Sequence, residues 1–147
     1  MRYVAPMDLQ QLSDRAEISD LLLRYSEALN TGDWDEWASC FTDDALVDYT
    51  TAGGVAGSTS EAIAWLSPTL SIFEMRIGRI ANIRVDFDGP DRANVQSQYS
   101  MLMRLPAAEG QNPTYIEAAG WYDDIAVRTS SGWLLRERVE RIAYTRM

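Results

Sequence analysis

The chain contains no histidine and a single cysteine, Cys40, among its 147 residues. Histidine is the commonest general base near neutral pH, so acid–base chemistry here must use carboxylates, tyrosines or arginines. One cysteine excludes an internal disulfide, and without histidine no set of nitrogen and sulfur ligands is available for zinc. Cys40 is expected to be a small core residue on a helix. The missing histidine therefore restricts the possible functions more than the possible folds.

Long apolar runs are lacking as well, since no stretch approaches the ~20 residues that a membrane-spanning helix needs. Residues 1–12 have neither the apolar core nor the small-residue cleavage site of a secretory signal, which predicts a cytoplasmic protein. The formal net charge is −9, and such a charge repels nucleic acids and anionic membranes. Neither is therefore expected as a partner.

The overall composition is that of an ordinary globular protein. Hydrophobic residues make up 46% of the chain and charged residues 24%. A chain of 147 residues can bury a substantial core as one unit. We therefore expect one domain over residues 1–147.

The first part of the chain has the pattern of helices. Apolar residues follow helical spacing over residues 14–30, where Asp14 and Glu17 have the spacing of a capping box. Asp33 and Glu36 repeat this signature and predict a short second helix. The second helix carries three aromatic residues, which are Trp34, Trp37 and Phe41.

A first strand and a third helix follow. The strand is predicted from three alternating residues, Ala45, Val47 and Tyr49. Residues 50–59 form a glycine-rich loop, which is expected to border a pocket mouth. Ser58 and Glu61 predict the cap of a helix through Trp65, which Pro68 is expected to end or kink.

From Arg79 onward the apolar pattern changes to the period of two that is typical of strands. Hairpin turns are predicted at residues 86–91 and 129–132, and residues 106–113 form a polar loop. Helices followed by antiparallel strands predict an α+β fold, in which one curved sheet wraps the helices. The strands are expected at residues 79–87, 93–105, 115–128 and 133–145.

Several motifs, in this order, resemble the nuclear transport factor 2-like superfamily and its SnoaL-like branch in particular. They are RY (24–25), ALN (28–30), GDWD (32–35), FTDDA (41–45) and a YDD…R…GW…R pattern (122–138). The resemblance covers nearly the whole chain. It implies a cystatin-like cone whose curved antiparallel sheet and first helices enclose an apolar cavity, with no cofactor and with homo-oligomers formed through the sheet. The branch includes polyketide cyclases, dehydratases, dehydrohalogenases, isomerases and noncatalytic proteins, so the fold does not fix the chemistry.

Enzymes of this branch often use an aspartate near the end of the first helix and a histidine before the second strand. At the corresponding positions this chain has Asn30 and approximately Gly78. An asparagine can bind a carbonyl group but cannot accept a proton at neutral pH. The resemblance therefore implies a similar site without the usual base.

Other positions match more closely. Tyr25 corresponds to the oxyanion-hole tyrosine of ketosteroid isomerases, which share this fold, and Asp124 lies near their neutral, hydrogen-bond-donating aspartic acid. In those enzymes the apolar surroundings raise the pKa of this carboxyl group, so that it stays protonated. Tyr49 stands where those enzymes have their general base, with Asp48 next to it on the opposite strand face. Arg138 matches a pocket arginine of the dehydrohalogenases, which could bind an enolate, a carboxylate or a leaving anion.

Strand alternation groups further residues into a candidate pocket, whose inward orientation is assigned by the resemblance. Ser97, Tyr99, Met101 and Met103 share one strand face, and Ala118, Gly120, Tyr122, Asp124 and Arg128 share the next. Small residues leave room there, and methionine and tyrosine suit a flat or polycyclic ligand. The proposed catalytic residues are Tyr25, Asn30, Asp124 and Arg138. The proposed substrate-binding residues are Leu29, Trp37, Val47, Tyr49, Trp65, Phe73, Tyr99, Met101, Gly120 and Tyr122.

Each of these assignments has a structural alternative. The inward residues can fill a solid core, and Tyr25 can be a core residue bonded to a carboxylate. Asp124 can pair with Arg128, four residues further on, and remain ionised. Arg138 can be one of several surface arginines that pair with glutamates across strands. The opposite face suggests an oligomer interface around Trp121, formed by Tyr115, Glu117, Ala119, Trp121 and Ile125.

Two main functions follow from the sequence. The first is a cofactor-independent cyclase, dehydratase or isomerase that acts on a hydrophobic polyketide-like or terpenoid-like intermediate, with catalysis by shape and by polarisation of a carbonyl group. The second is a noncatalytic small-molecule-binding protein or an accessory subunit of a larger enzyme, which the missing Asp/His pair supports. The small subunit of an aromatic-ring dioxygenase is a third possibility, although such subunits are usually longer.

Overall fold

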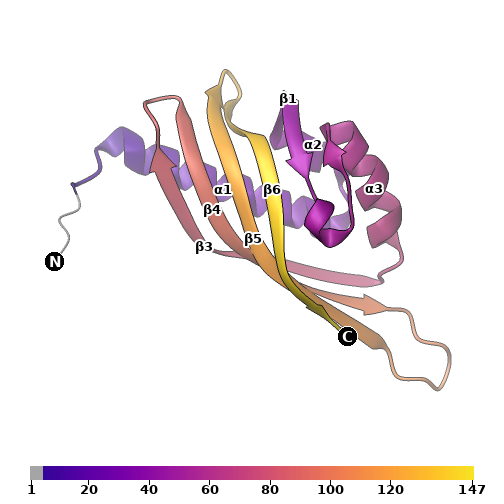
Figure 1. Ribbon diagram of the computed structural model, residues 1–147. Coiled ribbons are helices and arrows are strands. Elements are labelled where there is room, and N and C mark those ends of the chain that lie inside the picture. The colour runs from indigo at the N-terminus through magenta and orange to yellow at the C-terminus, as the bar shows by residue number, and fades with distance from the viewer. Residues whose placement is uncertain (1–4) are drawn as a thin grey trace.

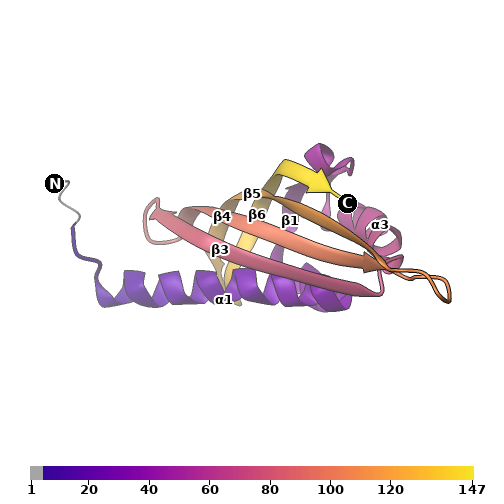
Figure 2. The same cartoon turned by 90° about the horizontal axis from the view of Figure 1, so that it is seen from below.

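The computed structural model describes residues 5–147. Residues 1–4, which belong to the expected domain and to the segment considered as a signal, lie outside the described residues. Figures 1 and 2 show a curved sheet with helices against one face. The elements are α1 (Leu9–Thr31), α2 (Trp34–Ser39), β1 (Phe41–Asp48), the 3-10 helix η1 (Thr50–Ala52), β2 (Ala56–Gly57), α3 (Thr59–Ser71), β3 (Met75–Phe87), β4 (Arg92–Leu105), β5 (Thr114–Thr129) and β6 (Gly132–Arg146).

The strands form one sheet in the order β2-β1-β6-β5-β4-β3. Strands β3 to β6 are consecutive antiparallel neighbours, as predicted, whereas β1 runs parallel to β6. This arrangement confirms the α+β class with N-terminal helices packed on a curved sheet. Among residues 5–147, no helix has the length and apolar character that crossing a membrane requires.

Helix α1 runs along the inner face of the sheet (Figure 2). Its predicted apolar residues are buried, but the helix begins at Leu9 instead of Asp14. The cap is Asp8, which forms a capping box with Gln11. Asp14 is a buried residue within the helix and bonds to groups on other elements. The prediction that the helix begins at Asp14 is therefore wrong.

The other two helices begin where the sequence predicts. The side chain of Asp33 accepts a hydrogen bond from the backbone of Glu36 at the start of α2. Ser58 and Glu61 form the capping box of α3. Pro68 does not end α3, which continues to Ser71. Proline removes one backbone donor, and the three residues after it keep helical geometry.

Strand β6 contains a bulge that changes which residues face the helices. Leu135 pairs with Ala126 and Glu137 pairs with Ile125, so Arg136 is an extra residue in β6. Trp133 and Leu135 are buried before the bulge, and Arg138 and Glu140 are buried after it. The bulge therefore moves the inward positions from odd to even residue numbers.

A second irregularity in the pairing of β5 with β6 lies next to Gly120. A Cβ atom on this residue would overlap the carbonyl oxygen of Arg141. Only glycine allows the two backbones to approach so closely at this bend. Gly120 is therefore a residue that shapes the sheet, which corrects its prediction as one that leaves room for a ligand.

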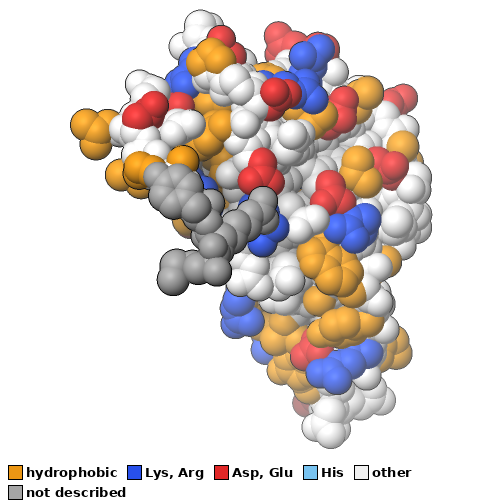
Figure 3. All heavy atoms as spheres, turned by 60° about the vertical axis from the view of Figure 1, so that its left-hand side comes forward, with side chains coloured by type: hydrophobic (Ala, Val, Ile, Leu, Met, Phe, Trp, Pro, Cys, Tyr) orange, Lys and Arg blue, Asp and Glu red, His pale blue; other side chains and the backbone are white. Residues whose placement is uncertain are grey.

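The outer face of the sheet carries scattered hydrophobic side chains. Figure 3 shows such side chains among arginines on the lower part of one face. The outward position of Trp121 agrees with the alternation, and the guanidinium of Arg141 lies 5.1 Å from its ring centre. Tyr115 is 44% exposed, so a part of the predicted interface is open to solvent. The homo-oligomer remains a prediction.

Candidate active site

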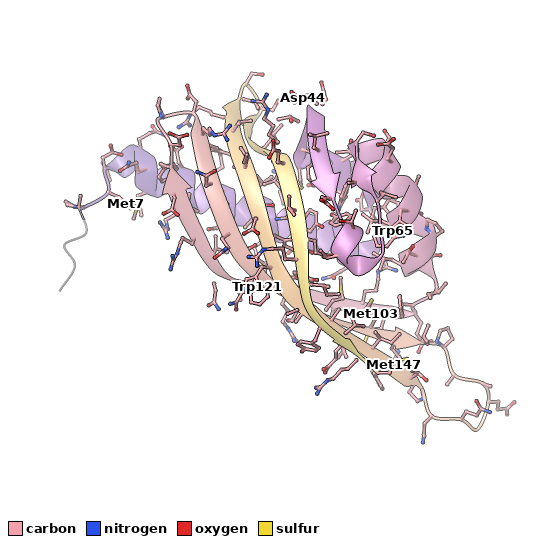
Figure 4. The ribbon with its side chains drawn as sticks, in the orientation of Figure 1. Met7, Asp44, Trp65, Met103, Trp121 and Met147 are labelled. Carbon is pink, nitrogen blue, oxygen red and sulfur yellow. The ribbon has the colours of Figure 1, made fainter. Side chains whose placement is uncertain are left out.

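A cavity of about 220 Å³ lies between the inner face of the sheet, the end of α1 and helix α3. Its walls are mostly apolar and aromatic, and Trp65 from α3 and Met103 from β4 are two of the side chains that enclose it (Figure 4). The residues that line it are Tyr25, Leu29, Tyr49, Ala52, Trp65, Leu66, Thr69, Leu70, Phe73, Tyr99, Met101, Met103, Ala118, Tyr122, Glu140, Ile142 and Thr145.

The cavity includes most of the residues that the sequence predicted for substrate binding. Seven of the ten predicted side chains line it: Leu29, Tyr49, Trp65, Phe73, Tyr99, Met101 and Tyr122. Trp37 and Val47 are buried in the core instead, and Gly120 lies at the bend of the sheet. The presence of this space shows that the inward residues do not fill the core completely. Residue 52, from the glycine-rich loop, reaches the cavity, as expected for a loop that borders it.

Two tyrosine hydroxyl groups meet in the cavity wall. The hydroxyl oxygens of Tyr25, from α1, and Tyr49, which follows β1, are 2.5 Å apart. Burial raises the pKa of Tyr49 well above its ordinary value, while the charge of Arg138 opposes this shift. The Tyr49 hydroxyl therefore stays neutral near pH 7, and one hydroxyl of the bonded pair can donate a hydrogen bond to an oxygen atom of a ligand.

Arg138 lies behind these tyrosines as half of a buried ion pair. Its Nε donates to Oδ1 of Asp124 at 2.8 Å, and its Nη2 donates to Oδ2 at 2.7 Å. The guanidinium carbon lies 4.0 Å from the ring centre of Tyr25 and 3.9 Å from that of Tyr122. Arg138 has an exposed fraction of 0%, so its interpretation as a surface arginine is wrong. The positive charge is held directly against the aromatic wall of the cavity.

Asp124 has a different partner from the one that its spacing suggested. Arg128 bonds to Asp14 and Asp91, whereas both carboxyl oxygens of Asp124 accept from Arg138. Burial raises the pKa of Asp124, and the paired guanidinium acts against this shift. Two bonds accepted from one guanidinium are the geometry of an ionised carboxylate. Asp124 is therefore placed to hold Arg138, and it is absent from the lining of the cavity.

The residues at the positions of the usual Asp/His pair contact one another. Oδ1 of Asn30 accepts from the backbone nitrogen of Gly78 at 2.7 Å, and its Nδ2 donates to the Gly78 carbonyl at 3.2 Å. A Cβ atom on Gly78 would lie 2.8 Å from Oδ1 of Asn30, so a larger residue would displace this amide. Asn30 thus joins α1 to β3, and it does not line the cavity.

Glu140 lines the cavity and was not among the predicted site residues. It is 8% exposed, and its Oε1 has no hydrogen-bond partner among residues 5–147. Burial raises the pKa of Glu140 to about 7, although the Tyr99 hydroxyl and Arg138 both favour its ionised form. The sequence held one signal for it, because Glu140 lies two residues after Arg138 on the same strand face.

Metal ligands are scarce in this fold. Within the described part of the chain, residues 5–147, no group of three or more histidine, cysteine, aspartate or glutamate side chains could hold a metal ion. The single thiol, Cys40, is buried at the end of α2. The chemical groups that the cavity offers are therefore hydroxyl groups, one carboxyl group and a guanidinium behind the wall.

Comparison with protein families and curated proteins gives consistent matches. The family model described as a SnoaL-like domain matches residues 10–139. An uncharacterized protein of Mycobacterium tuberculosis is 31% identical over 141 residues, which cover 96% of this chain and 93% of the relative. The family match runs from α1 into β6 and ends one residue before Glu140.

Solved structures share the fold over nearly the whole chain. A protein from Novosphingobium aromaticivorans that is named as a scytalone dehydratase superposes with a TM-score of 0.82 and 23% identity, covering 95% of this chain and 91% of that one. A type 2 hexachlorocyclohexane dehydrochlorinase gives a TM-score of 0.80 and 23% identity, with coverages of 95% and 92%. At these identities the superpositions show a shared fold and leave the reaction open.

Proposed function

This chain belongs to the family of SnoaL-like domains, and from that premise we propose that it is a cofactor-independent cyclase, dehydratase or isomerase. Its substrate is a hydrophobic polyketide-like or terpenoid-like intermediate that carries a carbonyl group. The names of two proteins with the same fold describe a dehydration and a dehydrochlorination, and both reactions are eliminations. This likeness supports the class of reaction and leaves the substrate to be identified.

One observation carries the proposal, which is the uneven distribution of polar groups around the cavity. Aromatic and aliphatic side chains form most of the wall, while Tyr25, Tyr49 and Glu140 supply oxygen atoms to it. An apolar cavity with a few polar groups holds a hydrophobic ligand in one orientation. A carbonyl oxygen of that ligand would be placed at the paired tyrosine hydroxyls.

The catalytic effect follows from orientation and from stabilisation of negative charge. Enclosure in the cavity brings the reacting atoms of a flexible substrate together, which lowers the entropic part of the barrier. One hydroxyl of the Tyr25 and Tyr49 pair donates to the oxygen on which charge develops, while the other donates to that hydroxyl, and the nearby Arg138 favours the charge. Removal of one such donor typically lowers kcat by about 100-fold or more.

A noncatalytic binding protein or accessory subunit is the second candidate. The observation that favours it is the contact between Asn30 and Gly78, which replaces the usual acid–base pair with a structural amide. Such a protein would use the same cavity and the same aromatic wall. It would bind hydrophobic carbonyl compounds without converting them.

Turnover by variants of two tyrosines separates these candidates. Purified protein is incubated with a panel of polyketide-like ketones, and substrate loss is followed by liquid chromatography with mass spectrometry. We expect Tyr25→Phe to lower kcat by about 100-fold. Tyr144→Phe, on a residue that is 48% exposed on β6, serves as the matched control and keeps wild-type activity. Binding of the whole panel without turnover would support the carrier and reject the enzyme.

A further inference from the structure

Glu140 is the one carboxyl group among the residues that line the cavity. The side chain comes from β6 and is 8% exposed. Its Oε1 has no hydrogen-bond partner among the described residues 5–147. A buried polar atom without a partner destabilises the folded protein, so its presence calls for an explanation such as a contact with a ligand. An unbonded oxygen in the wall of a cavity is placed to meet a group of the ligand.

The polar and charged groups near Glu140 come from strands β4, β5 and β6 and from the residue that follows β1. Tyr99 from β4 and Arg138 from β6 favour its carboxylate form. Tyr122 is its cross-strand neighbour on β5, and the charge of Glu140 also acts on Tyr49. These neighbours include one cation and no second carboxylate that faces the cavity. The proton on Glu140 is therefore controlled mainly by burial, by one hydroxyl group and by one guanidinium.

We infer that Glu140 takes up and returns a proton in this cavity, on a hydrophobic ketone whose carbonyl oxygen is bound by the hydroxyls of Tyr25 and Tyr49. This inference rests on the proposed function and names the base that the Asn30 and Gly78 positions do not supply. It also narrows the substrate to a ketone with a hydrogen atom on the carbon next to its carbonyl group.

The step balances within the cavity. The C–H bond next to the carbonyl breaks, and its proton forms an O–H bond on Glu140. The electron pair of that C–H bond forms a C=C bond, and the C=O π pair moves to the oxygen held by the tyrosines. Glu140 then gives the proton to the γ carbon of a β,γ-unsaturated ketone, in an isomerisation that moves the C=C bond into conjugation, or to a β-hydroxyl group that leaves as water; the C=O bond re-forms in both cases. Glu140 ends as a carboxylate in both cases.

The acidity of Glu140 suits this role. A general base works best when its pKa is near the working pH, because it must be ionised before the step and protonated after it. Burial raises the pKa of Glu140 to about 7, so both forms are populated at neutral pH. The rate at which the protein removes a proton from the ketone is therefore expected to rise with pH through about 7 and to level off above it.

Hydrogen–deuterium exchange on 2-tetralone tests the inference directly. This bicyclic ketone has acidic hydrogens next to its carbonyl group, and proton NMR in D₂O reports their loss without any need for the natural substrate. We expect wild-type protein to accelerate exchange above the buffer rate and Glu140→Gln to reduce that acceleration by at least about 100-fold. Glu140→Asp is expected to keep a part of it. Glu137→Gln, on the opposite face of the same strand, is the control and keeps the wild-type rate.

Binding of 2-naphthol separates failure of this inference from failure of the proposed function. This compound has the shape and the hydroxyl position of the enol, and its binding is followed through tryptophan fluorescence. If wild type and Glu140→Gln both bind it and exchange 2-tetralone equally fast, Glu140 is not the base, although the cavity remains a ligand site. Binding by wild type without exchange also shows that Glu140 is not the base. A wild-type protein that neither binds 2-naphthol nor exchanges 2-tetralone contradicts both proposals. Loss of exchange in Glu140→Gln with binding retained supports both.

Discussion

Two buried acidic clusters on the inner side of the sheet differ in how completely their polar atoms are bonded. Near the start of α1, Asp14 accepts hydrogen bonds from Gln10, Arg128 and the indole nitrogen of Trp133. At the cavity, Glu140 leaves Oε1 without a partner among residues 5–147, and Arg138 likewise leaves Nη1. The Asp14 carboxylate is fully hydrogen-bonded within the protein. The cluster at the cavity, in contrast, has one acceptor and one donor without a partner in the described part of the chain, beside an open space.

This difference separates a structural cluster from a candidate catalytic one. Arg128 lowers the pKa of Asp14, so the ionised carboxylate stabilises the fold. Burial raises the pKa of Glu140, so its ionised form is the less stable one in the folded protein. The pKa values of these two carboxyl groups are shifted in opposite directions. Of the two, Glu140 is therefore the one that can exchange a proton near neutral pH.

Removal of Arg138 is expected to give the largest effect. The substitution Arg138→Met leaves the buried carboxylate of Asp124 without its cation, which costs about 4 kcal/mol of unfolding free energy. Urea denaturation measures this loss. The double variant Arg138→Met with Asp124→Leu removes both charges and is expected to recover much of it. A double variant as unstable as the single one would contradict the buried-pair explanation.

Removal of Asp14 is expected to destabilise the protein without changing the cavity. The substitution Asp14→Ala leaves Trp133 Nε1 without its acceptor and removes the two bonds that Arg128 donates to Asp14, which costs about 3 kcal/mol. Because the pKa of Asp14 is lowered from 3.8, its contribution is present above that pH and is lost as the pH falls below it. Urea denaturation at pH 7 and at pH 3 checks the size and the sign. An altered affinity for 2-naphthol would show that the two clusters are not separate.

Neutralisation of Glu140 is expected to stabilise the protein at high pH, whereas removal of Asp14 destabilises it. Its folded-state pKa of about 7 lies above the usual 4.5, so its contribution to stability is present below 4.5 and is lost as pH rises through 7. The variant Glu140→Gln should therefore be more stable than wild type at pH 8, by about 2 kcal/mol, and similar to it near pH 4.5. Thermal unfolding at both pH values measures this change. A loss of stability at pH 8 would mean that Glu140 is a structural carboxylate like Asp14.

The smallest effect is expected for the tyrosine pair. The substitution Tyr49→Phe removes one hydroxyl and leaves Tyr25 without its 2.5 Å partner, which costs about 1 kcal/mol. A double-mutant cycle with Tyr25→Phe, followed by urea denaturation, gives the coupling energy between the two groups. A coupling near zero would show that the hydroxyls do not act together and would weaken their role as joint donors.

Much of the fold could be predicted because local signals and tertiary structure agree. Asp33 and Ser58 begin helices in the structure as in the sequence, and the period of two after Arg79 marks strands. Asp14 was misleading, because the same spacing of acidic residues occurs inside a helix whose carboxylate bonds to β5 and β6. The spacing of two acidic residues is the same whether the first one caps a helix or contacts a residue that is distant in the sequence, so spacing alone cannot distinguish the two cases.

The candidate site could be predicted only in part, for reasons that lie in strand register. Tyr25, Tyr49 and Tyr99 were found because a known fold places those positions in a pocket. The pairing of Asp124 with Arg138, instead of Arg128, depends on how β5 and β6 align. Glu140 was missed because five of residues 136–141 are charged, and because alternation counted from Trp133 places Glu140 on the outer face when the bulge is not known.

The extra residue at Arg136 has a consequence for how such proteins diverge. If the bulge were lost and Arg136 joined the regular pairing, strict alternation after Leu135 would turn Val139 and Arg141 toward the helices in place of Arg138 and Glu140. The ion pair and the free carboxyl group would then leave the interior together. Two strands that share every motif can thus differ in whether a carboxyl group faces the interior, according to whether the last strand keeps its bulge.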